Sequence, residues 1–155
     1  MGANKESEWV PVVIPRNRFS LGDGKGSPAI QGYIHRSRVY PIETIPEYEG
    51  SDFSFEYVIE DFTTKGKVIQ YLHGAVHRIN GRQIHGHDLS TPGKQIKEVR
   101  VTIEEVSIPI HPIFFEDIFA CDNDFTVHKM GELFIVHQWN SDGAGAYEIV
   151  WVLDK

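Results

Sequence analysis

The sequence has only one cysteine, Cys121, among its 155 residues. A single cysteine excludes an intrachain disulfide framework. Its neighbours are apolar or acidic and include no activating base, so we do not expect a reactive thiolate. The chain has no Gly-x-Ser-x-Gly elbow and no Rossmann fingerprint. These absences argue against nucleophilic hydrolysis and against a nicotinamide cofactor.

Positive charge is also scarce. Lysine and arginine number 15 against 22 aspartates and glutamates, which gives a formal net charge of −7. The basic residues form no cluster of the kind that neutralises phosphates. No apolar run approaches the roughly 20 residues of a membrane-spanning helix, and the N-terminal residues lack the apolar stretch of a signal peptide. We therefore expect a cytoplasmic protein without a nucleic-acid or membrane partner.

No stretch of ten or more residues shows the apolar period of 3.6 that marks a helix. Apolar residues instead alternate in short runs, separated by glycine, proline, asparagine and aspartate, which predicts antiparallel strands. The expected strands span residues 9–14, 30–42, 53–59, 67–79, 82–90, 95–107, 125–130, 133–139 and 147–153. Residues 1–8 are expected to be a flexible tail, and residues 9–155 a single domain.

This pattern predicts an all-β fold, an antiparallel β-barrel of about eight to nine strands, near the size that encloses one small ligand. The architecture is similar to lipocalin-like barrels and to the barrel of allene oxide cyclases. That likeness is one of strand succession only and transfers no residues. A β-sandwich or jelly roll is the alternative.

The most informative stretch spans residues 67–90, which we interpret as two strands joined at Asn80-Gly81. That dipeptide suits the two positive φ angles of a type I′ turn, which fixes the register of the hairpin. Counting outward from the turn places Ile79 opposite Arg82 and His73 opposite Asp88. Side chains on one face of a strand pair can act together, so this face is the expected catalytic wall.

The candidate catalytic residues are His73, Asp88, Tyr71 and His77. A carboxylate beside an imidazole orients the ring and raises its pKa, as a general acid or base requires. Tyr71 and His77 would lie one step away on the same face and could donate to a substrate oxygen. The alternative is a pair that only fills a polar gap in the barrel wall or faces water.

The candidate substrate-binding residues are the aromatic and imidazole side chains on the faces expected to point into the barrel. Counting outward from Gly131-Glu132 places His128 and His137 on one such face, together with Leu133, Ile135 and Trp139. The full set is Tyr33, His35, Phe55, Tyr57, His128, His137, Trp139, Tyr147 and Trp151. For each aromatic residue the alternative is ordinary core packing.

The triplet His85-Gly86-His87 has the spacing of many metal sites in sheets, because alternate residues of a strand share a face. Cupins place a glutamate a few residues after such a pair, whereas the next glutamate here is Glu98. His111 or Glu98 would have to supply the missing ligands. We therefore expect no metal and no other cofactor, and keep a metal-dependent cupin-like enzyme as an alternative.

Together these features favour a cofactor-independent enzyme of small-molecule or secondary metabolism. It would bind an apolar or aromatic substrate in the barrel lumen. As an isomerase or lyase, it would act as a simple isomerase, a cyclase, a dehydratase or a decarboxylase. The other class is a protein that binds a small hydrophobic ligand without chemistry. The expected partner is a small molecule, and the sequence leaves both a monomer and a homodimer open.

Overall fold

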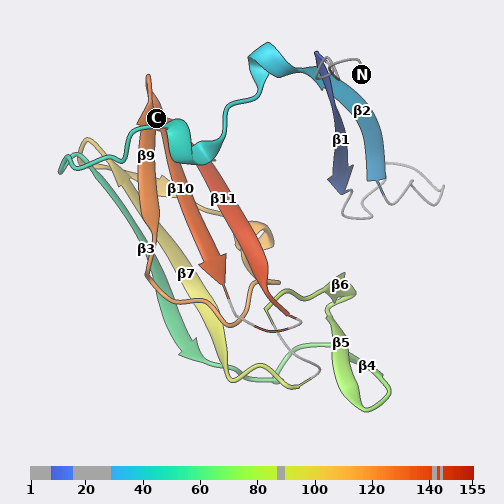
Figure 1. Ribbon diagram of the computed structural model, residues 1–155. Helices are drawn as coiled ribbons and strands as arrows, with labels where there is room; N and C mark the ends of the chain where they lie inside the picture. Colours follow the sequence, from blue (N-terminus) through green and yellow to red (C-terminus); the bar gives the residue numbers. More distant parts are fainter. Residues whose placement is uncertain (1–7, 16–28, 87–89, 141–142, 144) are drawn as a thin grey trace, which may run out of the picture. The chain divides into compact units, whose positions relative to one another are not determined.

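The computed structural model describes residues 8–15, 29–86, 90–140, 143 and 145–155. These residues form an all-β structure of four small antiparallel sheets (Figure 1). The expected all-β antiparallel class is confirmed. The expected closed barrel is wrong, since none of the four described sheets closes on itself. Within the described ranges, no helix is long and apolar enough to cross a membrane.

The chain divides into two compact units, residues 1–45 and residues 46–155. In the first unit β1 (Trp9–Pro15) pairs with β2 (Ala29–His35). The expected strand 30–42 ends early because a 3₁₀ turn, Arg36–Arg38, follows His35. The His35 imidazole caps that turn, with its Nδ1 accepting from the backbone N–H of Ser37 at 3.3 Å.

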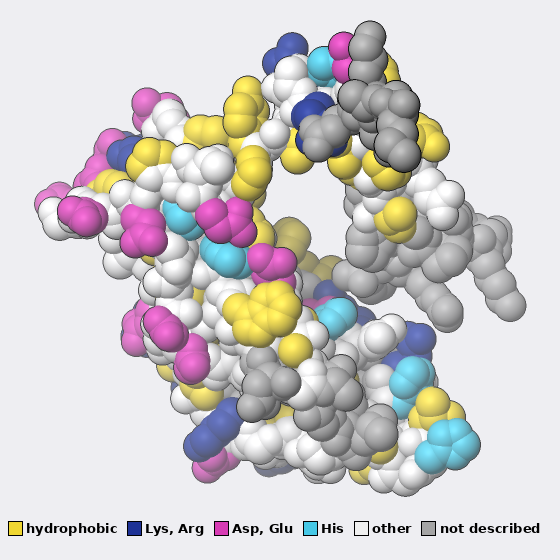
Figure 2. All heavy atoms as spheres, viewed as in Figure 1, with side chains coloured by type: hydrophobic (Ala, Val, Ile, Leu, Met, Phe, Trp, Pro, Cys, Tyr) yellow, Lys and Arg dark blue, Asp and Glu magenta, His cyan; other side chains and the backbone are white. Residues whose placement is uncertain are grey.

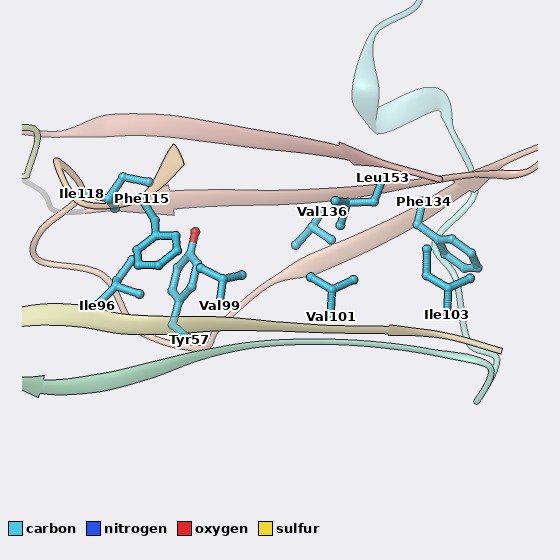
Figure 3. Packing of buried hydrophobic residues seen from close by; sticks show 10 residues of the cluster. All are labelled: Tyr57, Ile96, Val99, Val101, Ile103, Phe115, Ile118, Phe134, Val136 and Leu153. Atoms are coloured by element: carbon cyan, nitrogen blue, oxygen red, sulfur yellow. The ribbon is translucent and has the colours of Figure 1, made fainter. Parts of the chain in front are cut away.

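Two three-stranded sheets hold the main core of the second unit. One has the order β3 (Phe53–Asp61), β7 (Lys94–Ile103), β8 (Val106–Pro109), and the other the order β11 (Tyr147–Leu153), β10 (Leu133–Asn140), β9 (Thr126–Met130). Side chains of the two sheets meet between the layers (Figure 3). The buried members are Tyr57, Ile96, Val99, Val101, Ile103, Phe115, Ile118, Phe134, Val136 and Leu153. These two sheets therefore form two layers with the main core between them.

The core-facing side of β3 agrees with the sequence, but that of the last hairpins does not. Phe53 stacks on Phe134 with ring centroids 4.3 Å apart, as expected for an inward residue. Phe134 and Val136 face the core, and Val136 pairs with Trp151. Trp151 therefore lies on the face opposite His137, whereas the sequence analysis placed both on one face. The run 133–136 is apolar at every position, so alternation could not decide between its two faces.

The fourth sheet is formed by β4 (Ile69–Leu72), β5 (Ala75–Ile79) and β6 (Arg82–Gln83). The turn at Asn80-Gly81 is confirmed, with φ angles of 51° and 79°. The expected strand 67–79 is instead a hairpin, because His73 and Gly74 also adopt positive φ, 52° and 84°. This sheet has its own small core of Val76, Ile79, Ile84 and Phe119.

The excursion that carries this sheet begins and ends at neighbouring points of the larger sheet. Asp61 at the end of β3 is the register partner of Lys94 at the start of β7. The next pair continues the ladder, since the Phe62 N–H donates to the Gly93 carbonyl at 3.0 Å. A second unexpected turn lies further on: Glu104 and Glu105, with φ of 48° and 67°, divide the expected strand 95–107 into β7 and β8.

Candidate functional site: a histidine pocket

A pocket of about 590 Å³ is bordered by residues 72–77, 83–86 and 145–147 of the second unit. We call it the histidine pocket because His73, His77 and His85 all line it. Figure 2 shows histidine side chains (cyan) at the molecular surface over the β4–β6 sheet. Its remaining lining is mostly small or apolar, including Ala75 and Ile84. The hairpin, the stretch after β6 and the start of β11 thus meet at one concavity.

Arg82 fixes one side of the pocket to the segment that follows β8. Its Nη2 donates to the Asp117 carboxylate at 2.7 Å, and its Nη1 donates to the Glu116 carboxylate at 3.0 Å and to the Ile113 carbonyl at 2.5 Å. The Arg82 and Asp117 side chains are only 12% and 10% exposed. A charge pair this buried is costly to break from one side, since the remaining charge loses its partner.

The same segment holds the backbone of His85. The His85 N–H donates to the Asp117 carbonyl at 2.9 Å, and the Phe119 N–H donates to the His85 carbonyl at 3.0 Å. These two bonds form a short parallel bridge between His85 and Ile118. The His85 side chain is exposed, so the bridge presents an imidazole from a fixed backbone position.

Gly86 and Tyr147 close the floor of the pocket. Gly86 is buried with φ +82°, and a Cβ there would collide with the Phe119 carbonyl oxygen and lie 2.6 Å from Cε1 of Tyr147. The Tyr147 hydroxyl donates to the same Phe119 carbonyl at 2.7 Å. Burial raises the pKa of Tyr147, so its phenol stays protonated. Tyr147 therefore forms part of the pocket floor, and its single O–H is already bonded to the Phe119 carbonyl.

The other two imidazoles come from the β4–β5 hairpin. His73 occupies the first position of the two-residue turn and is exposed. His77 lies within β5 and is half-buried, next to Val76, which is buried in the small core. The β4–β5 register passes directly from Arg78 to Val76, so His77 is the extra residue of a β-bulge in β5. His73 and His77 both line the pocket, so the hairpin can present both imidazoles to one ligand.

The structure brings together only part of the expected catalytic set. His73 and His77 line the pocket, whereas Tyr71 does not and is 61% exposed on β4. Asp88 lies outside the described residues. The expected cross-strand place of His73 is wrong, since His73 sits in a turn and β6 ends at Gln83. In the described residues no carboxylate lines the pocket, so the candidate site differs from the one expected.

Of the expected substrate-binding residues, only Tyr147 lines the pocket. Phe55, Tyr57 and Trp151 belong to the main core or pack against it. The indole Nε1 of Trp151 donates to the Tyr57 hydroxyl at 2.9 Å, and burial raises the pKa of Tyr57. Tyr33 and His35 lie in the first unit. For the three core residues, the packing alternative describes what is observed.

His128, His137 and Trp139 lie on the face of the β9–β10–β11 sheet that points away from the main core. His128 is nevertheless buried, whereas Trp139 is 67% exposed. His137 Nε2 lies 2.6 Å from Glu148 Oε1, which forms an imidazole–carboxylate pair on this face. Glu148 is not among the site residues expected from the sequence. Its place becomes evident only from the β10–β11 register, in which Glu148 is the partner of Trp139.

The described residues contain no group of three or more histidine, cysteine, aspartate or glutamate side chains that could hold a metal ion. His87, half of the expected histidine pair, lies outside the described residues. Both candidates for the missing ligands have other partners: His111 accepts from the Ile113 N–H at 3.2 Å, and Glu98 pairs with Arg100 at 3.2 Å. Burial raises the pKa of Cys121 to about 11, so its thiol stays protonated near neutral pH.

Comparison with protein-family models, with curated proteins and with solved structures finds no match.

Proposed function

We propose that the protein binds a small molecule in the histidine pocket. The observation that carries the proposal is the meeting of three imidazoles, His73, His77 and His85, at one cavity of about 590 Å³. Ligand sites typically measure about 300–1,000 Å³ and combine apolar walls with a few polar groups. Val76 and Ile84 supply apolar wall here, and each imidazole offers a donor or an acceptor to a ligand.

The test is a fragment screen followed by amide chemical shifts of the full chain. Binders should shift resonances of residues 72–77, 83–86 and 145–147 in a saturable way. His77→Ala should weaken the affinity of these binders at least tenfold, because it removes the half-buried imidazole from the pocket wall. The matched control is His111→Asn, whose side-chain oxygen can still accept from the Ile113 N–H. Binders that shift only resonances near Trp139, or that bind His77→Ala unchanged, would refute the proposal.

The second candidate is a cofactor-independent isomerase or lyase acting at the same pocket. It is favoured by His77, because a half-buried imidazole beside apolar groups can both hold and move a proton on a bound ligand. Exchange of ligand C–H protons with D₂O would reveal such transfer without knowledge of the product. His77→Ala should slow the exchange about a hundredfold, the usual contribution of a general acid–base group.

His137→Ala is the control for this second candidate, because His137 is paired with Glu148 on another face. Its exchange rate should equal that of the unaltered protein. Exchange that depends on His137 and not on His77 would move the chemistry to the β9–β10–β11 sheet. Saturable binding without any exchange would leave the binding function and remove the catalytic one.

A further inference from the structure

The ionisable side chains that line the described part of the histidine pocket are the three imidazoles and the Tyr147 phenol. Within this described lining there is no lysine, arginine, aspartate or glutamate. Glu116 and Asp117, on the segment that bonds the His85 backbone, are bonded to Arg82, and Glu148, which follows Tyr147 on β11, lies 2.6 Å from His137. No lining carboxylate in the described part of the chain would therefore compensate a protonated imidazole.

Each element that borders the pocket contributes an imidazole or an aromatic ring. The β4–β5 hairpin contributes His73 and His77, and the stretch after β6 contributes His85. The start of β11 contributes Tyr147, whose hydroxyl donates to the Phe119 carbonyl. Tyr147 thus adds aromatic surface and no charge. The site combines three imidazoles with an apolar floor.

We infer that the ligand of the histidine pocket is a small aromatic or apolar acid, whose carboxylate or phosphate group is held by the imidazoles. This inference rests on the proposed function. A protonated imidazole has two N–H donors and no acceptor, which matches an oxyanion. Charge-assisted hydrogen bonds of this type are roughly twice as strong as neutral ones. The apolar body of the ligand would lie against Val76, Ile84 and the Tyr147 ring.

The inference predicts tighter binding as the pH falls. Histidine is the side chain whose charge ordinarily changes between about pH 5 and 8. A carboxylate that stays ionised throughout this range should therefore bind more tightly at pH 5.5 than at pH 8. A neutral ligand of the same shape should bind nearly equally at both values.

The experiment titrates the full chain with two matched pairs, benzoate against benzamide and phenyl phosphate against phenol, followed by amide chemical shifts. We expect each acid to bind at least tenfold more tightly than its neutral partner at pH 5.5. Benzoate binding should weaken about tenfold or more at pH 8. The relative affinity of benzoate and phenyl phosphate then identifies the preferred oxyanion.

Variants locate the effect. His73→Asn keeps a residue that tolerates positive φ at the turn, and His85→Asn keeps the backbone bridge, so both should fold. Each should reduce the preference for acid over neutral ligand several-fold, while His111→Asn should leave it unchanged. A His111→Asn loss as large as that of His85→Asn would show a general charge effect and overturn the inference.

The outcomes separate the inference from the proposed function. If benzamide and phenol bind the pocket as tightly as their acids, the ligand class is wrong and the binding function stands. If no fragment of any class shifts the amide resonances of residues 72–77, 83–86 or 145–147, the inference and the proposed function both fail. Acid preference that persists in the His73→Asn/His85→Asn double variant would also overturn the inference, because the anion would then be held elsewhere.

Discussion

Replacing Gly86 by alanine should damage the floor of the histidine pocket more than its small volume suggests. Gly86 has φ +82°, where an L side chain costs about 1–2 kcal/mol. The added Cβ would also collide with the Phe119 carbonyl, and overpacking typically costs about 1–3 kcal/mol. Stiffening of the unfolded chain offsets about 0.4–1 kcal/mol of this. We expect Gly86→Ala to lower the free energy of unfolding by about 3 kcal/mol.

Gly74→Ala is the matched control for this prediction. Gly74 has a nearly equal φ of +84°, but a Cβ there meets no atom within 4 Å. The conformational cost is then the whole effect, about 1 kcal/mol after the unfolded-state offset. Urea unfolding followed by tryptophan fluorescence would measure both variants, with a cooperative transition as the condition for comparison.

The difference between the two variants, about 2 kcal/mol, measures the close approach of Gly86 to Phe119 and Tyr147. Equal losses in the two variants would refute the reasoning, since they would mean that Phe119 does not lie against Gly86. The amide resonance of Phe119 gives a second readout. It should shift strongly in Gly86→Ala and stay in place in Gly74→Ala, because only the first collides with its peptide group.

Two further predictions concern buried polar groups. Arg82→Ala should destabilise the protein by about 3–5 kcal/mol, because it leaves the Asp117 carboxylate buried without its cation. In urea unfolding, the double change Arg82→Met/Asp117→Leu should recover much of this loss. If the double variant recovers no stability, the pair is not buried as described. Burial raises the pKa of Cys121 to about 11 and raises the pKa of Tyr57 and Tyr147. Because the folded state holds these protons more tightly, stability should be constant below about pH 8.5 and fall as the pH rises toward 11, and a urea midpoint equal at pH 7 and pH 10.5 would contradict this.

Local sequence patterns predicted the strands and turns that are determined by adjacent residues. Tyr147–Leu153 has the bounds expected from alternation, and the turn at Asn80-Gly81 follows from the two positive φ angles that this dipeptide tolerates. His73-Gly74 obeys the same chemistry, since histidine is enriched among residues with positive φ and glycine adopts it freely. It was missed because the strand pattern on both sides runs through it. Glu104-Glu105 carries no such signal, and its turn is set by the pairing of Ile103 with Val106.

Arrangement in space was less predictable than the strands themselves. Alternation says that a strand has a buried face, but whether the edges of a sheet meet depends on contacts far apart in the sequence. The run Leu133–Val136 is apolar throughout, so its orientation was decided by packing against Phe53 and not by its own pattern. The arrangement of the candidate site was likewise not predicted by local patterns. His73, His77 and Tyr147 do line one pocket, but they meet through the Gly86–Phe119 approach and not through a barrel lumen.

The closely spaced ends of the excursion between β3 and β7 have an evolutionary consequence. Because Asp61 pairs with Lys94 and Phe62 with Gly93, the chain leaves the layered core and returns to it through a narrow neck. Insertions are tolerated where their ends lie close together. This excursion carries the three histidines of the pocket, whereas the main core lies between the two large sheets. Selection could therefore change the ligand preference of the pocket without repacking the core around Tyr57.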